Sequence, residues 1–118
     1  MSLAEVTDVI DGKAVYGRPV DIHEVKIAYE AYDQLLALDP YDVEDFLTAH
    51  RLLTQGLLRE SGRFRSGDVA VYDGDTPVHS GARPQFVPGL ITDLFAWARE
   101  SDLHPVLLSA VIHCEIET

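Results

Sequence analysis

The stretch Asp68–Ser80, DVAVYDGDTPVHS, differs from the rest of the chain in its hydrophobic pattern. Apolar residues alternate with other residues on both sides of Asp73-Gly74, and this period of two is typical of strands rather than helices. Asp-Gly is favoured in two-residue turns because both central positions need positive φ, which Asp tolerates and Gly adopts freely. The stretch therefore predicts one β-hairpin with its turn at Asp73-Gly74.

Two helices are predicted on the N-terminal side of this hairpin. Asp21 is a suitable N-cap for a helix that runs to about Leu38, and Asp42 starts a second helix that ends near Leu58. Apolar residues at steps of three and four predict the buried face of the first helix. That face consists of Ile22, Val25, Tyr29, Tyr32 and Leu36.

Helical spacing resumes after the hairpin, in Pro84–Glu100 and again in Pro105–Thr118. Pro88 fits only within the first turn of its helix. A shorter helix is expected at Leu3–Ile10, ended by Asp11-Gly12 and followed by a linker to Pro19. The fold class is therefore mainly α, with four substantial helices and one small hairpin.

Length and charge limit the classes of function. A chain of 118 residues is one domain's worth. Twenty acidic residues against nine basic ones give a net charge of −11, which disfavours direct binding of nucleic acid. No apolar run reaches the roughly 18 residues of a membrane span, and Met1–Val9 carries no visible export signal, so we expect a cytoplasmic protein.

The cysteine and the histidines do not suggest a metal site. Cys114 is the one cysteine and is expected to be a buried, inert thiol. The five histidines include no His-x-x-x-His pair, and we expect local hydrogen bonds to satisfy them. His113 and Glu117 are four residues apart and can form a solvated contact on one helix.

The stretch Glu60–Gly67, which contains two arginines around Phe64, is the most distinctive local feature. It is either a polar connector or a pair of arginines that hold carbonyl groups at the end of the preceding helix.

Four stretches, in this order, make the chain similar to the Fic family, and the resemblance spans nearly the whole chain. They are Asp8–Lys13 followed by Glu24-Val25-Lys26; Ala49–Leu53 followed by Gly56-Leu57; Gly62–Arg65; and Asp102–Pro105 followed by Ala110 and His113. The resemblance implies a Fic-like helical bundle with one small hairpin, truncated at its C-terminus. It implies one partial Fic domain over 1–118, with an N-terminal helical segment and linker in 1–19 and the core portion in 20–118.

The resemblance also implies an activity for the complete domain, which is transfer of AMP from ATP to a hydroxyl group of a target protein, with magnesium. The family's catalytic motif is His-Pro-Phe-x-Asp/Glu-Gly-Asn-Gly-Arg, and this sequence does not contain it. We therefore expect no catalytic residue and no cofactor in this chain, and no transferase activity of its own. ATP and magnesium are expected only for the complete domain of a bacterial protein.

Site residues follow from the same resemblance. The hairpin matches the family's flap, which clamps a segment of the target protein by strand-like pairing and borders the nucleotide. Its residues are Val69, Val71, Tyr72, Asp73 and Gly74. His113 and Arg65 are expected to support the catalytic loop. The alternative is that these residues form an ordinary surface hairpin.

A second hypothesis is a catalytically inactive module that binds another protein or itself. The resemblance implies that further helices cover the segment Pro105–Thr118 in relatives. Without them that segment would expose an apolar patch, and self-association through it is expected.

Overall fold

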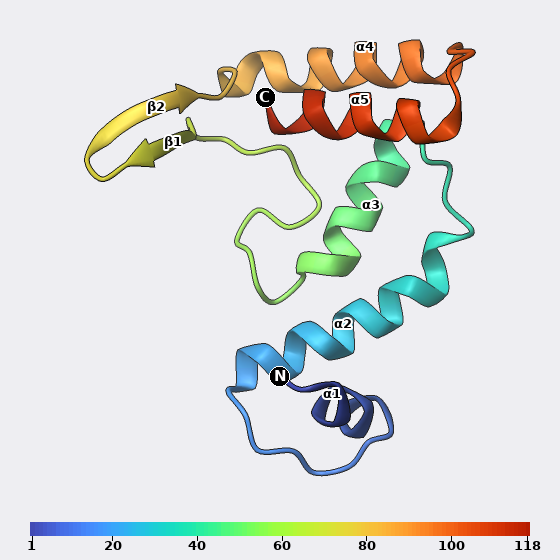
Figure 1. The fold of residues 1–118 in the computed structure, drawn as a ribbon, viewed down its shortest axis with the longest axis vertical. Helices are drawn as coiled ribbons and strands as arrows, with labels where there is room; N and C mark the ends of the chain where they lie inside the picture. The colour runs from blue at the N-terminus through green and yellow to red at the C-terminus, as the bar shows by residue number, and fades with distance from the viewer. The chain divides into compact units, whose positions relative to one another are not determined.

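The structure is a computed structural model that describes residues 1–118, and the chain divides into two units. The first unit comprises residues 1–40 and 44–63, and the second comprises residues 41–43 and 64–118. The elements in chain order are α1 (Leu3–Ile10), α2 (Pro19–Leu35), α3 (Val43–Thr54), β1 (Ala70–Asp73), β2 (Thr76–Ser80), a 3-10 turn (Pro84–Phe86), α4 (Val87–Arg99) and α5 (Pro105–Glu117) (Figure 1). The prediction of a mainly α fold with one small hairpin is confirmed.

In the first unit, α1 begins and ends where its sequence predicts. The Ser2 hydroxyl accepts a hydrogen bond from the Glu5 amide, and the Glu5 carboxylate accepts one from the Ser2 amide, so two free N–H groups of the first turn are satisfied. Gly12, at φ 76°, takes the left-handed conformation that follows a helix end. Helix α1 packs against α2 and buries Val9.

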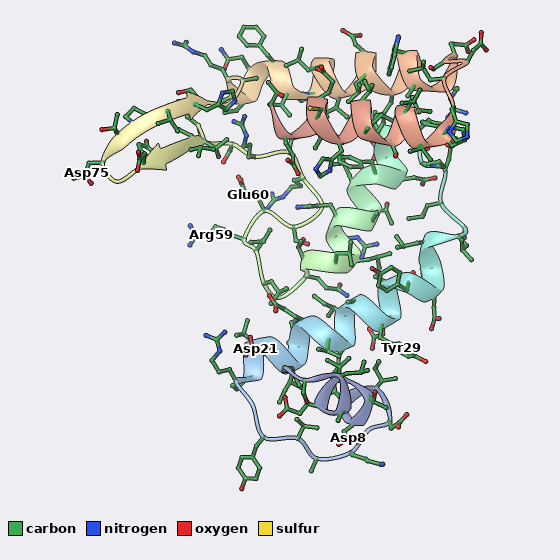
Figure 2. All side chains as sticks on the ribbon, in the orientation of Figure 1. Asp8, Asp21, Tyr29, Arg59, Glu60 and Asp75 are labelled. Carbon is green, nitrogen blue, oxygen red and sulfur yellow. The ribbon has the colours of Figure 1, made fainter.

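The start of α2 differs from the prediction. The N-cap is Arg18, and Pro19 occupies the first turn, where a missing N–H costs nothing, so Asp21 is not the cap. Asp21 lies within the first turn instead (Figure 2). Its carboxylate accepts two hydrogen bonds of 3.0 Å from the Arg18 guanidinium. The hydrogen bond from Arg18 lowers the pKa of the Asp21 carboxyl group.

The predicted buried face of α2 is wrong in its C-terminal half. Tyr29, Tyr32 and Leu36 are exposed, Leu36 at 97%, whereas Ile27 and Ala31 are buried. The helix also ends earlier than predicted, at Leu35 rather than near Leu38. Two rows of residues on α2 have helical spacing, and the packing of the other elements selects the row that contains Ile27 and Ala31. Figure 2 shows Tyr29 projecting from α2.

Helix α3 ends at Thr54, four residues before the predicted end at Leu58. Gly56 has a φ of 78°, which ends the helix, and a Cβ atom there would lie 2.6 Å from Nε2 of His23. The same Nε2 atom of His23 lies 2.8 Å from the Gln55 carbonyl oxygen, so the turn after α3 is attached to α2. The first unit also buries Leu52.

In the second unit, β1 and β2 form an antiparallel hairpin at the predicted place, but its turn is shifted by one residue. Asp73 pairs with Thr76, so Gly74 and Asp75 are the two turn residues. Gly74 has a φ of 62° and Asp75 has none in the positive range, which suits a turn that needs positive φ at its first central position only. The predicted Asp73-Gly74 turn is therefore wrong by one position.

Helices α4 and α5 pack against each other in the second unit (Figure 1). Pro88 lies in the first turn of α4, as predicted, and α4 buries Phe95 and Ala98. Helix α5 has no buried residue. Cys114 is exposed on it, so the prediction of a buried thiol is wrong.

Every helix of the structure is too short or too polar to cross a membrane.

Candidate functional site

The hairpin exposes nearly all of its side chains. Each residue of β2 is exposed, and so are Val71, Tyr72 and Asp73 of β1, whereas Ala70 is half-buried. Val69, just before β1, is exposed as well. Asp75 lies at the tip of the hairpin (Figure 2). All the predicted flap residues are therefore placed together in one protruding ribbon, where a partner can reach them.

The two strands are not a uniform ladder. Val71 pairs with His79 and Tyr72 pairs with Pro77, which leaves Val78 as an extra residue in β2. Pro77 has no N–H, so β2 lacks a donor, whereas every residue of β1 keeps its N–H. Strand β1 thus carries the more complete set of backbone groups for pairing with a further strand.

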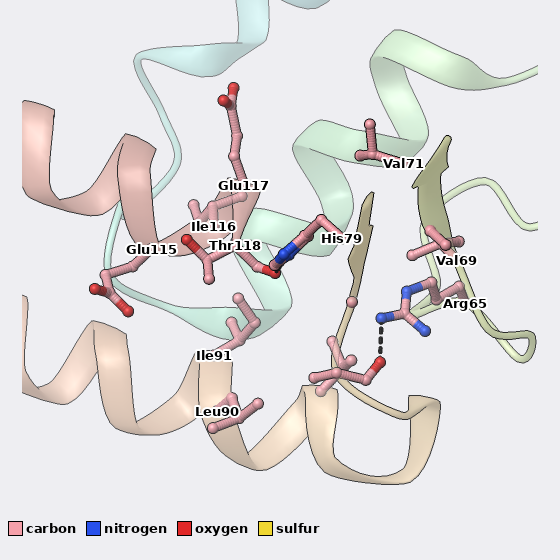
Figure 3. A pocket seen from close by; sticks show the side chains of 14 residues that line it. Arg65, Val69, Val71, His79, Leu90, Ile91, Glu115, Ile116, Glu117 and Thr118 are labelled. Carbon is pink, nitrogen blue, oxygen red and sulfur yellow. Dashed lines mark hydrogen bonds between the residues drawn. The ribbon is translucent and has the colours of Figure 1, made fainter. Parts of the chain in front are cut away.

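A cavity of about 310 Å³ lies at the base of the hairpin (Figure 3). Strand residues such as Val71 and His79 line it, together with Leu90 and Ile91 of α4 and the last residues of α5. Its charged side chains are Arg65, Glu115 and Glu117. The cavity is mostly apolar with a few polar groups at its edge, which is the usual composition of a recognition site.

Arg65 lies at this base and contacts both ends of the hairpin. Its Nη1 atom donates to the Gly67 carbonyl oxygen at 2.9 Å, and its Nη2 atom donates to the Ala82 carbonyl oxygen (Figure 3). Arg63, by contrast, donates to the Arg59 carbonyl oxygen at 3.4 Å. Both arginines hold carbonyl groups, but neither holds those at the end of the preceding helix, because α3 ends at Thr54. Arg63 bonds to the turn after α3, and Arg65 bonds to the two ends of the hairpin.

His79 makes a contact that the sequence did not predict. Its Nε2 atom lies 2.7 Å from the backbone oxygen of Thr118, so β2 is connected to the residue that follows α5 (Figure 3). The strand period places His79 in β2, but a link to a residue 39 positions away has no local signal in the sequence.

Of the other histidines, His104 and His113 have local partners, as predicted, whereas the partners of His23 and His50 are 32 and 12 residues away. His23 lies against the Gln55 carbonyl oxygen; the Nδ1 atoms of His50 and His104 accept hydrogen bonds from the Gly62 and Val106 amides; and Nε2 of His113 lies 3.1 Å from the Glu117 carboxylate. His113 and Glu117 are both largely exposed. Support of a catalytic loop by His113 stays a prediction.

The donor groups present do not fit ATP or magnesium. No three His, Cys, Asp or Glu side chains among residues 1–118 gather as potential metal ligands. At the cavity, the guanidinium of Arg65 is already bonded to two carbonyl groups, and Glu115 and Glu117 would repel phosphate.

Comparison with known proteins agrees with this architecture. The model of the Fic/DOC family matches residues 40–118. The crystal structure of a Fic family protein from Desulfovibrio desulfuricans G20 superimposes with a TM-score of 0.88 at 40% sequence identity, over 98% of this chain. The chain belongs to the Fic/DOC family. The resemblance drawn from the four sequence stretches is thereby confirmed.

This Fic-family chain spans 35% of the length of that solved protein. No functionally curated protein matches it. The matched segment 40–118 contains the hairpin, Arg65 and helices α4 and α5, so the whole candidate site lies within the family-matched part.

Proposed function

We propose that this chain supplies the target-binding hairpin of a Fic-family protein that transfers AMP from ATP to hydroxyl groups of a target protein. The observation that carries the proposal is the exposed, two-stranded ribbon at Ala70–Ser80, inside the segment that matches the family. A free strand edge binds an extended segment of another protein through backbone hydrogen bonds. The exposed Val71 and Tyr72 offer the side-chain contacts that select the segment.

By itself, the 118-residue chain is proposed to be inactive, because its sequence contains no His-Pro-Phe-x-Asp/Glu-Gly-Asn-Gly-Arg motif. The test incubates the purified chain with ATP labelled at its α-phosphate, with Mg²⁺ and with a cell lysate. We expect no labelled protein. A labelled protein that depends on the chain would overturn this part of the proposal.

The complete domain is tested by sequencing the gene past the codon for Thr118 and expressing the longer product. We expect the motif to follow and the longer protein to label its target, and we expect replacement of the motif's histidine by alanine to abolish labelling. A stop codon at that place would contradict the proposal and favour the second candidate below.

The role of the hairpin in target binding is tested by substitutions in its turn. Gly74→Val places a β-branched residue at a φ of 62°, which is strained, so the turn should open and target labelling should fall by at least about tenfold. Asp75→Val adds the same side chain at the neighbouring position, where positive φ is not required, and serves as the matched control. Equal activity of the two variants would exclude the hairpin from target binding.

A second candidate function is self-association or binding of another protein through α5. One observation favours it, which is that α5 has no buried residue although Leu103, Val106, Leu107, Val111 and Ile116 on or beside it are large and exposed. An apolar patch of this kind is typical of interaction surfaces. We also propose that the protein is cytoplasmic.

The measurement for this candidate is light scattering of the chain over a range of concentrations. We expect the average mass to rise above 13.1 kDa, and Leu107→Gln to lower it again. Leu36→Gln changes another exposed leucine, the residue that follows α2, and should have no effect. A monomer at every concentration would contradict self-association.

A further inference from the structure

The two strands of the hairpin contribute little to its stability. All five residues of β2 and three of the four residues of β1 are exposed. The strands therefore bury no hydrophobic core against a second layer of structure. The extra residue Val78 also interrupts the ladder. An isolated two-stranded hairpin is at best marginally stable in water, so the order of this one depends on its turn and its base.

The base is closed by a small set of contacts. The Gly81 amide donates to the Val69 carbonyl oxygen at 2.9 Å, which joins the two ends of the hairpin through the backbone. A Cβ atom at Gly81 would lie 3.0 Å from Cγ2 of Val69 and 3.2 Å from Nη2 of Arg65. The approach is therefore close, and the guanidinium of Arg65 is part of it.

Arg65 connects the two ends a second time. Gly67 precedes β1 and Ala82 follows β2, so one guanidinium donates to a carbonyl group on each side of the hairpin. Hydrogen bonds from a charged donor are stronger than neutral ones, and the planar guanidinium holds its N–H groups in fixed directions. Lysine has a compact charge and cannot reproduce this geometry.

We propose that Arg65 is a positioning residue that holds the hairpin ordered before a target segment arrives. The proposal rests on the proposed function of the hairpin as the receiver of an extended segment. A strand edge that is already ordered binds without a further loss of conformational entropy, so its affinity is higher. The edge of β1, which has no proline, is the expected template.

The matched control is provided by Arg63, two residues earlier. It carries the same side chain, but the hydrogen bond of its guanidinium, to the Arg59 carbonyl oxygen at 3.4 Å, lies outside the hairpin. Arg65→Lys and Arg63→Lys therefore make the same chemical change, and only the first removes the connection between Gly67 and Ala82.

The first measurement is amide hydrogen exchange of the 118-residue chain. Exchange of protected amides depends on local opening, so loss of the Arg65 contacts should raise the rates in Ala70–Ser80 by at least about tenfold, the factor that corresponds to one charge-assisted hydrogen bond. Rates in α4 and α5 should stay unchanged, and Arg63→Lys should leave the hairpin as it was. Unchanged hairpin rates in Arg65→Lys would overturn the inference.

Gly81→Ala keeps the inference testable should Arg65→Lys fail to fold. The added methyl group presses on Val69 and Arg65 from the other side, so hairpin exchange should rise in this variant too. No rise in a folded Gly81→Ala chain would count against a base that is closed by these contacts.

The second measurement is made on the longer gene product with its target. We expect Arg65→Lys to raise KM for the target protein by about tenfold and to leave kcat at saturating target close to that of the unchanged protein, because a disordered edge binds less well. Faster hairpin exchange with an unchanged KM would overturn the role of the hairpin in target binding. Slow exchange with a raised KM would overturn the role of Arg65 in ordering it.

Discussion

Helices α4 and α5 have the same length and neighbouring positions, yet they use their apolar residues differently. Each has 13 residues and a proline in its first turn. Helix α4 buries Phe95 and Ala98, at 3% and 2% exposure, whereas α5 buries no residue. The run Pro105–Cys114 of α5 nevertheless contains no Asp, Glu, Lys or Arg.

The difference separates apolar composition from burial. A helix that is apolar on all sides is normally surrounded by protein, while a helix with one apolar face normally lies at a surface. In this chain α5 is apolar on all sides over Pro105–Cys114, yet it is exposed. Its side chains should therefore add little to the stability of the chain and should be available for binding.

The largest expected effect concerns one large apolar residue in each helix. Phe95→Ala should lower the free energy of unfolding by about 3 to 5 kcal/mol, because a buried ring leaves a cavity. Leu107→Ala, at an exposed position of α5, should change it by less than about 0.5 kcal/mol. Urea unfolding at low protein concentration measures both. Similar costs for the two changes would mean that α5 is as well packed as α4.

Enlargement of a small residue gives the next effect. Ala98→Leu should destabilise the chain by about 1 to 3 kcal/mol, because the buried site has no room for three more carbon atoms. Ala110→Leu adds the same atoms at an exposed position of α5 and should be nearly neutral. Thermal unfolding distinguishes the two. A large loss at Ala110 would place that face of α5 in a packed environment.

The helix starts give a smaller effect. The Nδ1 atom of His104 accepts a hydrogen bond of 3.2 Å from the Val106 amide, whereas the residue before α4, Phe86, makes no such bond. His104→Ala should therefore cost about 0.5 to 1 kcal/mol, and His104→Asn, which keeps an acceptor, should cost less. Equal losses in the two variants would show that the hydrogen bond is not what stabilises the start of α5.

The smallest expected effect concerns the Arg18–Asp21 pair at the start of α2, outside both helices, and serves as a reference for the effects in α4 and α5. The hydrogen bond from Arg18 lowers the pKa of Asp21 in the folded chain, so the contribution of this pair is present above the ordinary pKa of aspartate, about 3.9, and is lost as the pH falls through the lowered pKa. Asp21→Asn should lower Tm slightly at pH 7, and this difference should shrink as the pH falls through the lowered pKa of Asp21.

The control for this titration is Arg18→Gln, which removes the partner of Asp21. In that background Asp21→Asn should leave Tm at pH 7 unchanged. A remaining difference would show that Asp21 acts through something other than the guanidinium, such as the N-terminal end of α2.

Local patterns predicted where the elements lie, because helices and strands have distinct periods. They failed where two local choices were equally good. Asp73-Gly74 and Gly74-Asp75 both form two-residue turns, and the pairing of Asp73 with Thr76 selects the second. Similarly, Pro19 takes over the start of α2 from Asp21, and Gly56 ends α3 before the apolar pattern does.

Burial and the contacts of the candidate site were harder to predict. The choice between Tyr29 and Ala31 as buried residues of α2, and the exposure of Cys114, depend on what packs against each helix. The residues predicted for the flap could be located in the hairpin because the hairpin is local. The contacts of Arg65 with Ala82 and of His79 with Thr118 join positions 17 and 39 residues apart, which no periodicity encodes.

The exposed thiol of Cys114 can report whether another molecule covers α5. Cys114 follows Leu107 by seven residues and Val111 by three, so the three side chains share one side of the helix. Because the chain has no other cysteine, the rate of alkylation by a maleimide reads that side alone. Any molecule that covers the helix slows the reaction, and a dye attached there provides a tag without further engineering.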